Sequence, residues 1–284
     1  MAYANPDALR STEWLAERLD DPRVRILDGS FHVPGVGRDP RAEYRERHIP
    51  GAAFFDIDDI RDPAIDLPHM LPPAEIFAAR IAALGIANGD TVVAYDAPGS
   101  AAAPRVWWTF RAFGHADVAV LDGGMEKWLA EGRLVTDRPP PIPPVSYAAR
   151  FSGATVRSLE DLMFNLDTGA EQVIDARSPG RFAGTDPEPR PALQAGHIPG
   201  SLNLPFPAFM DPERHGTWRD ADAIRTIFDE AGVDMARPIV GSCGSGVTAC
   251  AIAFAAHLIG KDDAAVYDGS WAEWGNRRDT PVER

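Results

Sequence analysis

Cysteine is scarce in this sequence, and its scarcity excludes two kinds of protein. Only Cys243 and Cys250 occur among 284 residues. Seven residues of helix would separate their Cα atoms by about 10 Å, which is beyond the reach of a disulfide. A disulfide-stapled fold and a zinc motif of paired cysteines are therefore excluded, and two unpaired thiols indicate a reducing compartment.

Long apolar segments and basic clusters are also missing. The longest apolar run covers residues 249–259, contains His257, and falls well short of the roughly 20 residues that span a bilayer. Acidic side chains interrupt residues 1–19, where a secretory signal would be apolar. Lys and Arg total 28 against 42 Asp and Glu, a net charge of -14 with no basic tract. We therefore expect a cytoplasmic protein that binds neither a membrane nor nucleic acid.

The chain is a tandem repeat with an offset of about 147 residues. Four pairs of segments match in order: 26–28 with 173–175, 48–51 with 197–200, 93–96 with 240–243, and 121–123 with 267–269. Five prolines between positions 139 and 144 separate the halves and favour an extended, semi-rigid linker. The sequence therefore predicts an N-terminal domain over 1–137, a proline-rich linker over 138–149 and a C-terminal domain over 150–284.

Each half alternates short β-branched runs with helical patterns. Strands are predicted over 24–27, 91–95 and 117–121, and again over 172–175, 238–241 and 264–267. Helices are predicted over 73–84, 220–231 and 246–259, each ended by a glycine. This alternation with short links indicates an α/β fold, in which helices cover a mainly parallel sheet in each domain. Reactive loops would then lie at the carboxyl ends of strands.

Cys243 lies in such a loop, between a predicted strand and a small apolar helix. The loop runs Cys243-Gly244-Ser245-Gly246-Val247-Thr248. Its two glycines allow successive backbone N–H groups to point inward, beside a helix N-terminus. This environment favours a thiolate, which a sulfur nucleophile needs at neutral pH. The alternative is a buried structural cysteine, an interpretation that fits Cys250 on its apolar helix face.

These features together resemble the tandem rhodanese superfamily, and within it the 3-mercaptopyruvate sulfurtransferases. The resemblance rests on the two-domain plan, on His-Ile-Pro-Gly in each half and on the loop from Cys243 to Thr248. It covers nearly the whole chain. In that family the C-terminal domain carries the active cysteine and the N-terminal domain has lost it. Here Asp96 occupies the equivalent position, so the first domain is expected to be inactive.

The resemblance implies a two-step transfer that needs neither a metal nor another cofactor. The Cys243 thiolate takes the sulfur of 3-mercaptopyruvate, pyruvate leaves, and a persulfide remains on the protein. Cyanide, a thiol or reduced thioredoxin then removes the outer sulfur. The loop amides, with Gly244, Gly246, Val247 and Thr248 as substrate-binding residues, would stabilise both the thiolate and the persulfide anion.

The donor is inferred from charge around the loop. Thiosulfate is a compact dianion, and thiosulfate-specific relatives place basic residues just after the cysteine, where this chain has Gly244 and Ser245. Arg181 and Arg190 lie in segments that resemble the part of the mercaptopyruvate enzymes that holds the substrate carboxylate. Guanidinium groups suit a planar carboxylate because each donates a fork of hydrogen bonds. Without the resemblance, two arginines in an irregular stretch would indicate only solvated surface charge.

The first domain is expected to handle protons. Carried over by position, the resemblance groups Asp58 and His69 with the loop serine, Ser245. An imidazole with an ordinary pKa of ~6.5 can take the proton of the donor thiol or supply one to the departing enolate. Asp58 would orient His69 and stabilise its charged form. The alternative is that Asp58 caps a turn and His69 packs within a loop.

Some conspicuous residues are better explained by structure. His48 and His197 recur in both halves, including the half without a cysteine, which indicates a shared turn rather than catalysis. The tryptophan pairs at 107–108 and at 271 and 274 have helical spacing, which favours the core or the domain interface.

Three other functions compete with the main interpretation. A thiosulfate:cyanide sulfurtransferase would differ only in its donor. A cysteine phosphatase would need an arginine where this chain has Ala249, which disfavours that chemistry. A non-catalytic rhodanese binding module would form no persulfide.

Overall fold

The computed structural model describes residues 2–284 and contains two five-stranded sheets with the same strand order. The first sheet is ordered β1 (Leu9–Arg10), β5 (Val118–Leu121), β4 (Thr91–Tyr95), β2 (Val24–Asp28) and β3 (Ala52–Phe54). The second is ordered β6 (Val156–Arg157), β12 (Ala265–Tyr267), β11 (Ile239–Ser242), β7 (Gln172–Asp175) and β8 (Leu202–Asn203). Every pairing in both sheets is parallel. The expected α/β architecture in tandem is confirmed.

The central strands lie where the sequence predicts them, within a residue or so at each end. The edge strands β1, β3, β6 and β8 are only two or three residues long. Runs this short carry no periodic signal, so the sequence analysis missed them. It also missed a small antiparallel pair in the second half, β9 (Met210–Asp211) and β10 (Thr217–Trp218).

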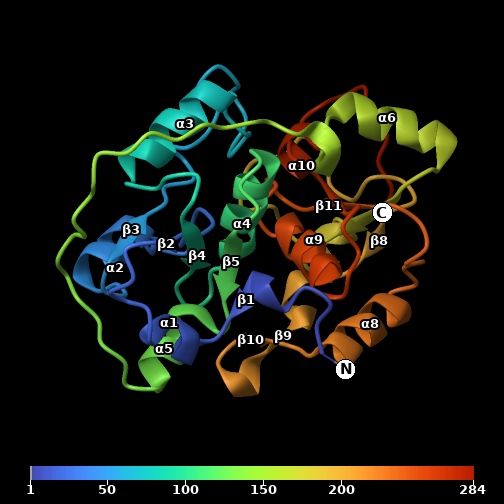
Figure 1. The fold of residues 1–284 in the computed structure, drawn as a ribbon. Coiled ribbons are helices and arrows are strands. Elements are labelled where there is room, and N and C mark those ends of the chain that lie inside the picture. The colour runs from blue at the N-terminus through green and yellow to red at the C-terminus, as the bar shows by residue number, and fades with distance from the viewer. Residues whose placement is uncertain (1) are drawn as a thin grey trace.

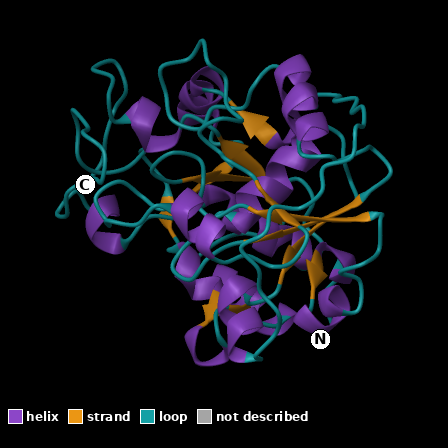
Figure 2. Ribbon diagram, turned by 90° about the vertical axis from the view of Figure 1, so that its left-hand side faces the viewer, coloured by secondary structure: helices purple, strands orange, loops and turns teal. Residues whose placement is uncertain are grey.

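Helices surround the strands of both sheets (Figure 2). Those of the first half are α1 (Thr12–Ala16), α2 (Pro40–Glu46), α3 (Ala74–Ala83), α4 (Ala103–Ala112) and α5 (Gly124–Ala130). Those of the second are α6 (Leu159–Thr168), α7 (Pro179–Phe182), α8 (Ala221–Glu230), α9 (Ala249–Leu258) and α10 (Ser270–Trp274). Helices α3, α8 and α9 end just before the glycines that the sequence indicates. Gly85, Gly232 and Gly260 have φ values of 76°, 75° and 93°. That left-handed conformation is easily adopted only by glycine.

The two halves meet along α4 and α9, which lie side by side at the centre of the molecule (Figure 1). All ten residues of α9 are buried, as its apolar sequence requires. Trp107 of α4 packs edge-on against Phe254 of α9, with ring centroids 4.9 Å apart. This tryptophan therefore belongs to the domain interface, one of the two places expected for it.

The linker between the halves and the N-terminal residues also make hydrogen bonds with the body of the protein. The chain after α5 runs along the outer edge of the first half before it reaches α6 (Figure 1). There the Asn88 side chain exchanges two 2.8 Å hydrogen bonds with the backbone of Ala148. In return, the N-terminal residues lie on the second half, where Ala4 N–H donates to the Leu258 carbonyl at 2.8 Å. The linker is therefore packed against the protein rather than free.

Two matching hydrogen bonds cross between the halves. The Leu71 N–H donates to Asp268 Oδ2 at 2.7 Å, and the Trp218 N–H donates to Asp122 Oδ1 at 2.8 Å. Leu71 and Trp218 are counterparts in the repeat, as are Asp122 and Asp268. The two halves therefore contact each other with approximate twofold symmetry.

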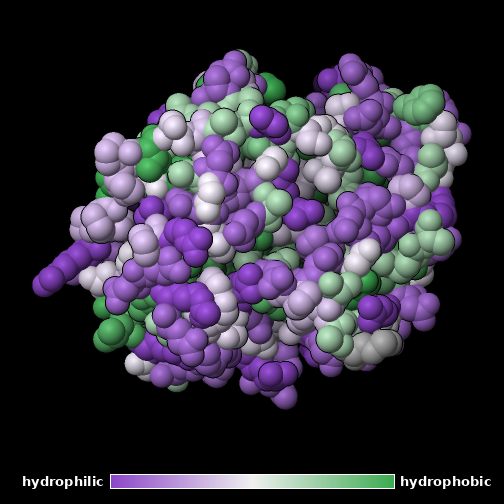
Figure 3. Space-filling view, in the orientation of Figure 1, coloured by the Kyte–Doolittle hydropathy of each residue, from purple (hydrophilic) through white to green (hydrophobic). Residues whose placement is uncertain are grey.

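The visible surface agrees with the composition. Hydrophilic side chains dominate the face seen in Figure 3, and hydrophobic ones are scattered in small groups. Among residues 2–284, no helix has both the length and the apolar character needed to cross a bilayer.

Candidate active site

Cys243 is the first residue after β11, and its side chain is 2% exposed. The loop turns at Gly246, whose φ is 73°, before α9 begins at Ala249. A Cβ atom on Gly246 would lie 2.6 Å from the Asp268 carbonyl oxygen, so a side chain does not fit there. Within residues 2–284, the N–H groups of residues 244–248 donate to no carbonyl or side chain. These backbone donors are available to an anion beside the thiol.

A buried serine that the sequence analysis missed contacts the thiol. Ser270, at the start of α10, has its hydroxyl oxygen 4.0 Å from Cys243 Sγ, and that oxygen accepts a 3.2 Å hydrogen bond from the Cys243 N–H. Its φ of 48° is unusual for a residue other than glycine. The repeat could have drawn attention to this serine. Asp268-Gly269-Ser270 matches Asp122-Gly123-Gly124, and only the half with the cysteine has a hydroxyl at the third position.

Cys250 lies in a different environment. Its side chain is completely buried in α9, and its Sγ donates to the Gly246 carbonyl at 3.2 Å. Burial raises the pKa of this thiol well above its usual range, so the sulfur stays protonated. These contacts fit the structural role expected for it.

The structure brings Asp58, His69 and Ser245 together, but Arg190 lies between them. His69 Nδ1 is 3.2 Å from Asp58 Oδ1, at an angle outside hydrogen-bond geometry. Arg190 Nη2 donates to His69 Nε2 at 3.1 Å, and Nη1 donates to Ser245 Oγ at 3.4 Å. Because a guanidinium is only a donor, His69 Nε2 must be unprotonated in this arrangement.

Asp58 favours the charged form of His69, as expected, but other effects outweigh it. Burial lowers the pKa of His69, and the positive charges of Arg190 and Arg105 lower it further. Asp58 acts in the opposite direction but does not outweigh them. His69 is therefore a neutral imidazole near pH 7, in a form that can accept a proton.

The two predicted arginines have different partners. Arg181 Nε and Nη2 both donate to Glu188 Oε2, at 3.1 and 2.5 Å. Glu188 also accepts from the buried Arg177 at 2.7 Å. A Cβ atom on Gly244 would lie 2.7 Å from Arg181 Nη2, so this guanidinium packs directly against the cysteine loop. Sequence reasoning gave no role to Arg177 or Glu188, although Glu188 begins the segment Glu188-Pro189-Arg190 that contains one of the two predicted arginines.

Arg190 forms no ion pair with a carboxylate within residues 2–284. It is partly buried, and burial lowers its pKa from the usual value of a guanidinium. Its carbon Cζ lies 5.8 Å from the centre of the Phe31 ring, a cation–π distance. A cation without a carboxylate partner at the edge of a reactive loop is suited to bind an anionic ligand.

A cavity of about 370 Å³ opens over the cysteine loop, and both halves line it. The predicted residues on its wall are Cys243, Gly244, Ser245, Val247, Thr248, Arg181 and Arg190. Phe31 and Ser100 come from the first half. Asp58, His69 and Gly246 are not on the wall, and His69 reaches the cavity through its contact with Arg190.

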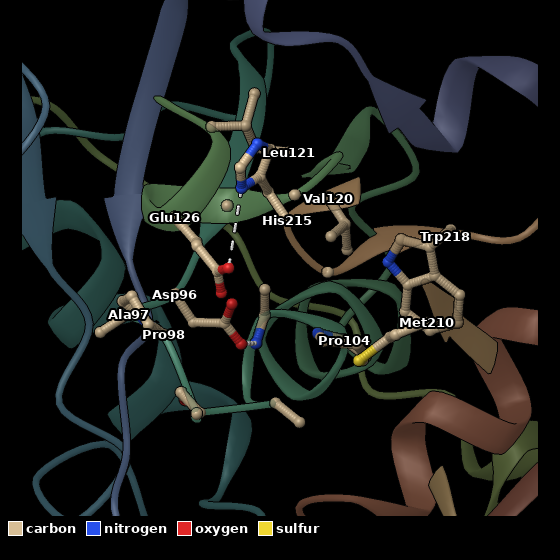
Figure 4. Close-up of a pocket in the computed structure, with 17 residues that line it drawn as sticks. Asp96, Ala97, Pro98, Pro104, Val120, Leu121, Glu126, Met210, His215 and Trp218 are labelled. Carbon is tan, nitrogen blue, oxygen red and sulfur yellow. Dashed lines mark hydrogen bonds and ion pairs between the residues drawn. The ribbon is translucent and has the colours of Figure 1, made fainter. Parts of the chain in front are cut away.

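A smaller cavity of about 80 Å³ lies at the corresponding place beside Asp96, and residues of both halves line it (Figure 4). Asp96 follows β4 directly and is half-buried there, and its Oδ2 accepts hydrogen bonds from the N–H groups of Ala102 and Ala103 at 2.7 and 2.9 Å. Glu126 and His215 lie across the cavity, 3.8 Å apart. Burial raises the pKa of Asp96 to about 6.

The repeated histidines have the structural role expected of them. His48 and Thr136 exchange backbone hydrogen bonds of 2.8 and 2.9 Å, and His197 and Glu283 exchange bonds of 2.8 and 3.1 Å. These bridges join the turn before Pro-Gly to the end of each half, and neither histidine lines the cavity over the cysteine loop.

Comparison with known proteins identifies the family. The family model for the rhodanese-like domain matches residues 11–131 and 158–277. The chain belongs to the rhodanese family. Both matched rhodanese domains fall within the divisions that we propose, 1–137 and 150–284.

The relatives include sulfurtransferases named for two different sulfur donors. The chain is 46% identical to the 3-mercaptopyruvate sulfurtransferase of Rattus norvegicus over 94% of its length and 91% of the relative. It is 45% identical to the thiosulfate sulfurtransferase of Bos taurus, over 95% and 92%. These matches support a sulfurtransferase that uses a small-molecule sulfur donor and acceptor.

The fold comparison agrees. The crystal structure of SseA from Escherichia coli, described with the 3-mercaptopyruvate sulfotransferases, superposes with a TM-score of 0.85 at 36% identity. That match covers 94% of this chain and 99% of SseA. The recognition of a tandem rhodanese sulfurtransferase from sequence is thereby confirmed.

Proposed function

We propose that the protein transfers sulfur from 3-mercaptopyruvate through a persulfide on Cys243. The thiolate attacks the donor sulfur, the S–S bond forms, and the carbon–sulfur bond breaks. Its electron pair leaves as the enolate of pyruvate, and the proton of the donor thiol ends on the methyl carbon. The protein then holds a persulfide anion, and an acceptor removes the outer sulfur and restores the thiolate.

The observation that carries this proposal is the distribution of positive charge. Gly244 and Ser245 provide none directly after the cysteine, whereas Arg190 lines the cavity without a carboxylate partner. One guanidinium suits the single carboxylate of mercaptopyruvate better than the compact dianion thiosulfate. Arg181 is a second cation on the wall, but Glu188 offsets its charge.

The other residues have roles that follow from their contacts. The free N–H groups of residues 244–248 would stabilise the thiolate and the persulfide anion. Ser245 donates to the substrate or to the sulfur, since Arg190 already donates to its oxygen. Neutral His69 accepts the thiol proton at Nε2 through a solvent molecule once the donor carboxylate has drawn Arg190 away from that atom, and Asp58 orients the ring.

Single-turnover kinetics test the proposal. Protein mixed with 3-mercaptopyruvate and no acceptor should gain the mass of one sulfur atom and release one equivalent of pyruvate. The Cys243→Ser variant should do neither, while Cys250→Ser should behave as wild type. Unchanged mass of the wild-type protein would instead support a non-catalytic binding module.

Thiosulfate is the second candidate donor, because thiosulfate sulfurtransferases match this chain almost as well as the mercaptopyruvate enzymes. Steady-state kcat/KM with each donor, measured with cyanide as the acceptor, decides between them. A higher value for thiosulfate would overturn our argument from loop charge.

We also propose that a thiol or reduced thioredoxin is the biological acceptor and that the protein works in the cytoplasm. Both cysteines are free, which fits a reducing compartment. A relative from Arabidopsis thaliana is named as mitochondrial, so fractionation of the source cells is the direct test. Turnover driven by reduced thioredoxin, compared with turnover driven by dithiothreitol, tests the acceptor.

A further inference from the structure

Arg105 reaches the cysteine loop from the other half of the molecule. It lies in α4 and is 2% exposed. Its Nη1 donates to Asp268 Oδ1 at 2.6 Å and to the Gly246 carbonyl at 3.0 Å, and its Nη2 donates to the His69 carbonyl. A charged side chain buried to this degree depends on such partners, because each offsets part of its lost hydration.

Asp268 extends these contacts to a further segment. Its Oδ1 accepts from Arg105, and its Oδ2 accepts from the Leu71 N–H at 2.7 Å. One buried ion pair therefore joins the segment 69–71, the loop after Cys243 and the end of β12. The first two are the opposite sides of the candidate active site.

The symmetry of the molecule shows that this arginine is an addition to the contact between the halves on one side only. On the other side, Asp122 accepts the equivalent hydrogen bond from the Trp218 N–H. Since α4 and α9 begin at Ala103 and Ala249, the counterpart of Arg105 is Ala251, which has no polar side chain. The contact between halves exists on both sides, but the arginine exists only on the side of the thiol.

The position of Arg105 also gives it an electrostatic effect on both reactive groups. Its positive charge is one cause of the lowered pKa of His69. Burial lowers the pKa of Arg105, but nearby negative charge, that of Asp268 first and that of Cys243 least, raises it. The guanidinium therefore stays charged and attracts an anionic sulfur.

We propose that Arg105 is a positioning residue for sulfur transfer: it fixes the His69 segment against the cysteine loop and adds a buried positive charge beside the thiolate. This inference rests on the function proposed above. It assigns to the inactive half a direct part in shaping the reactive half, through a side chain that does not touch the substrate.

The test compares three variants by the rate constant of persulfide formation, with thermal unfolding as a check on the fold. Arg105→Met removes the charge and all three hydrogen bonds, and we expect a loss of about 100-fold, because small displacements of reacting groups cost this much. Arg105→Lys keeps the charge and should recover about 10-fold of that loss. The control, Asp122→Ala, breaks the equivalent contact on the other side and should stay within about twofold of wild type.

The proposal fails if Arg105→Met keeps the wild-type rate, or if Asp122→Ala loses the rate to the same extent. If Arg105→Met does not fold, the Arg105→Lys and Asp122→Ala pair decides. KM for mercaptopyruvate should change less than threefold in Arg105→Lys, because this residue does not line the cavity.

A second readout separates this inference from the donor assignment. Alkylation of Cys243 by iodoacetamide, followed by peptide mass, needs no sulfur donor. Arg105→Met should lower the alkylation rate at pH 7, since the loss of a buried cation disfavours an anionic sulfur, and Arg105→Lys should lower it less. An unchanged alkylation rate in both variants would overturn the electrostatic part of the proposal even if the donor proved to be thiosulfate.

Discussion

The two halves of this protein share one fold, but they differ in the loop that follows the central strands β4 and β11. In both, a parallel strand ends in a loop that leads into an interface helix, and the first loop residue is Asp96 in one half and Cys243 in the other. Asp96 places its own carboxylate on the N–H groups of Ala102 and Ala103. The loop after Cys243 leaves its N–H groups without protein acceptors in the described chain, residues 2–284.

The residue that packs beside Asp96 or Cys243 also differs between the halves. Gly124 packs against Asp96, where a Cβ atom would lie 2.8 Å from the Asp96 carbonyl oxygen. Its counterpart Ser270 places a hydroxyl beside the thiol. The inactive half has therefore filled its anion site with a carboxylate, and the active half keeps that site open for a sulfur anion. Chemistry is decided by a few side chains on a shared backbone.

The largest effect should come from removing the thiol. Cys243→Ser should reduce persulfide formation by at least about 1,000-fold, because a hydroxyl is a far weaker nucleophile at neutral pH. Adding Asp96→Cys to this variant should restore nothing, since the described residues that line the cavity around position 96 include His215 but no arginine to bind the carboxylate of the donor. Sulfur bound at position 96, detected by peptide mass, would show that the two loops are chemically equivalent after all.

The next largest effect should come from removing Arg190, the arginine without a carboxylate partner. Arg190→Ala should raise KM for mercaptopyruvate by ~30-fold, the equivalent of about 2 kcal/mol for a lost charged hydrogen bond. Arg181→Ala should raise it by less than about 5-fold, because Glu188 already holds that guanidinium. KM for cyanide should change little in either variant. Equal increases for the donor and for cyanide would mean that the arginines hold structure.

The same variant should change the titration of His69. Since the Arg190 charge is one cause of the lowered pKa, Arg190→Ala should raise the pKa of this imidazole. NMR of the histidine ring measures it directly. A pKa that fell or stayed constant would show that the contact between Arg190 and His69 is absent in solution.

A moderate effect on stability is expected in the inactive half. The pKa of Asp96 rises to about 6 in the folded protein, so the folded state binds this proton more tightly than the unfolded state does. Asp96 therefore favours folding at low pH, and about 3 kcal/mol of that contribution is lost as the pH rises from about 4 to about 6. Asp96→Asn should remove this dependence in denaturant unfolding measured across that range. An identical pH dependence in the variant would contradict the shift.

The smallest effect should come from the second thiol. Cys250→Ser should keep the activity within about twofold, because the serine hydroxyl can donate to the Gly246 carbonyl as the thiol does. Steady-state rates with mercaptopyruvate and cyanide measure this. A large loss would show that Cys250, not Cys243, responds to the donor.

The sequence predicted those parts of the site that are local in the chain. The central strands, the helix stops and the loop of Cys243 each carry their signal within a few residues. The pair of Arg181 with Glu188 lies within a single short segment, yet no pattern distinguishes a guanidinium held by a carboxylate from one that is free.

Contacts between distant segments could not be predicted. Arg190 touches His69, which is 121 positions away, and Arg105 touches Asp268, 163 positions away. Charged side chains in an amphipathic pattern are expected at the surface, so Arg105 gave no sign that it would be buried. Even the direction of the His69 pKa shift depends on burial and on these two arginines, which only the fold brings together.

The N-terminal residues and the linker each pack on the half to which they do not lead, and this arrangement affects how the protein unfolds. The first residues are bonded to the surface of the second half, and the linker is bonded along the first. Unfolding of either half would therefore break the hydrogen bonds of a segment that belongs to the other half. Calorimetry should record one cooperative transition, although the chain contains two domains.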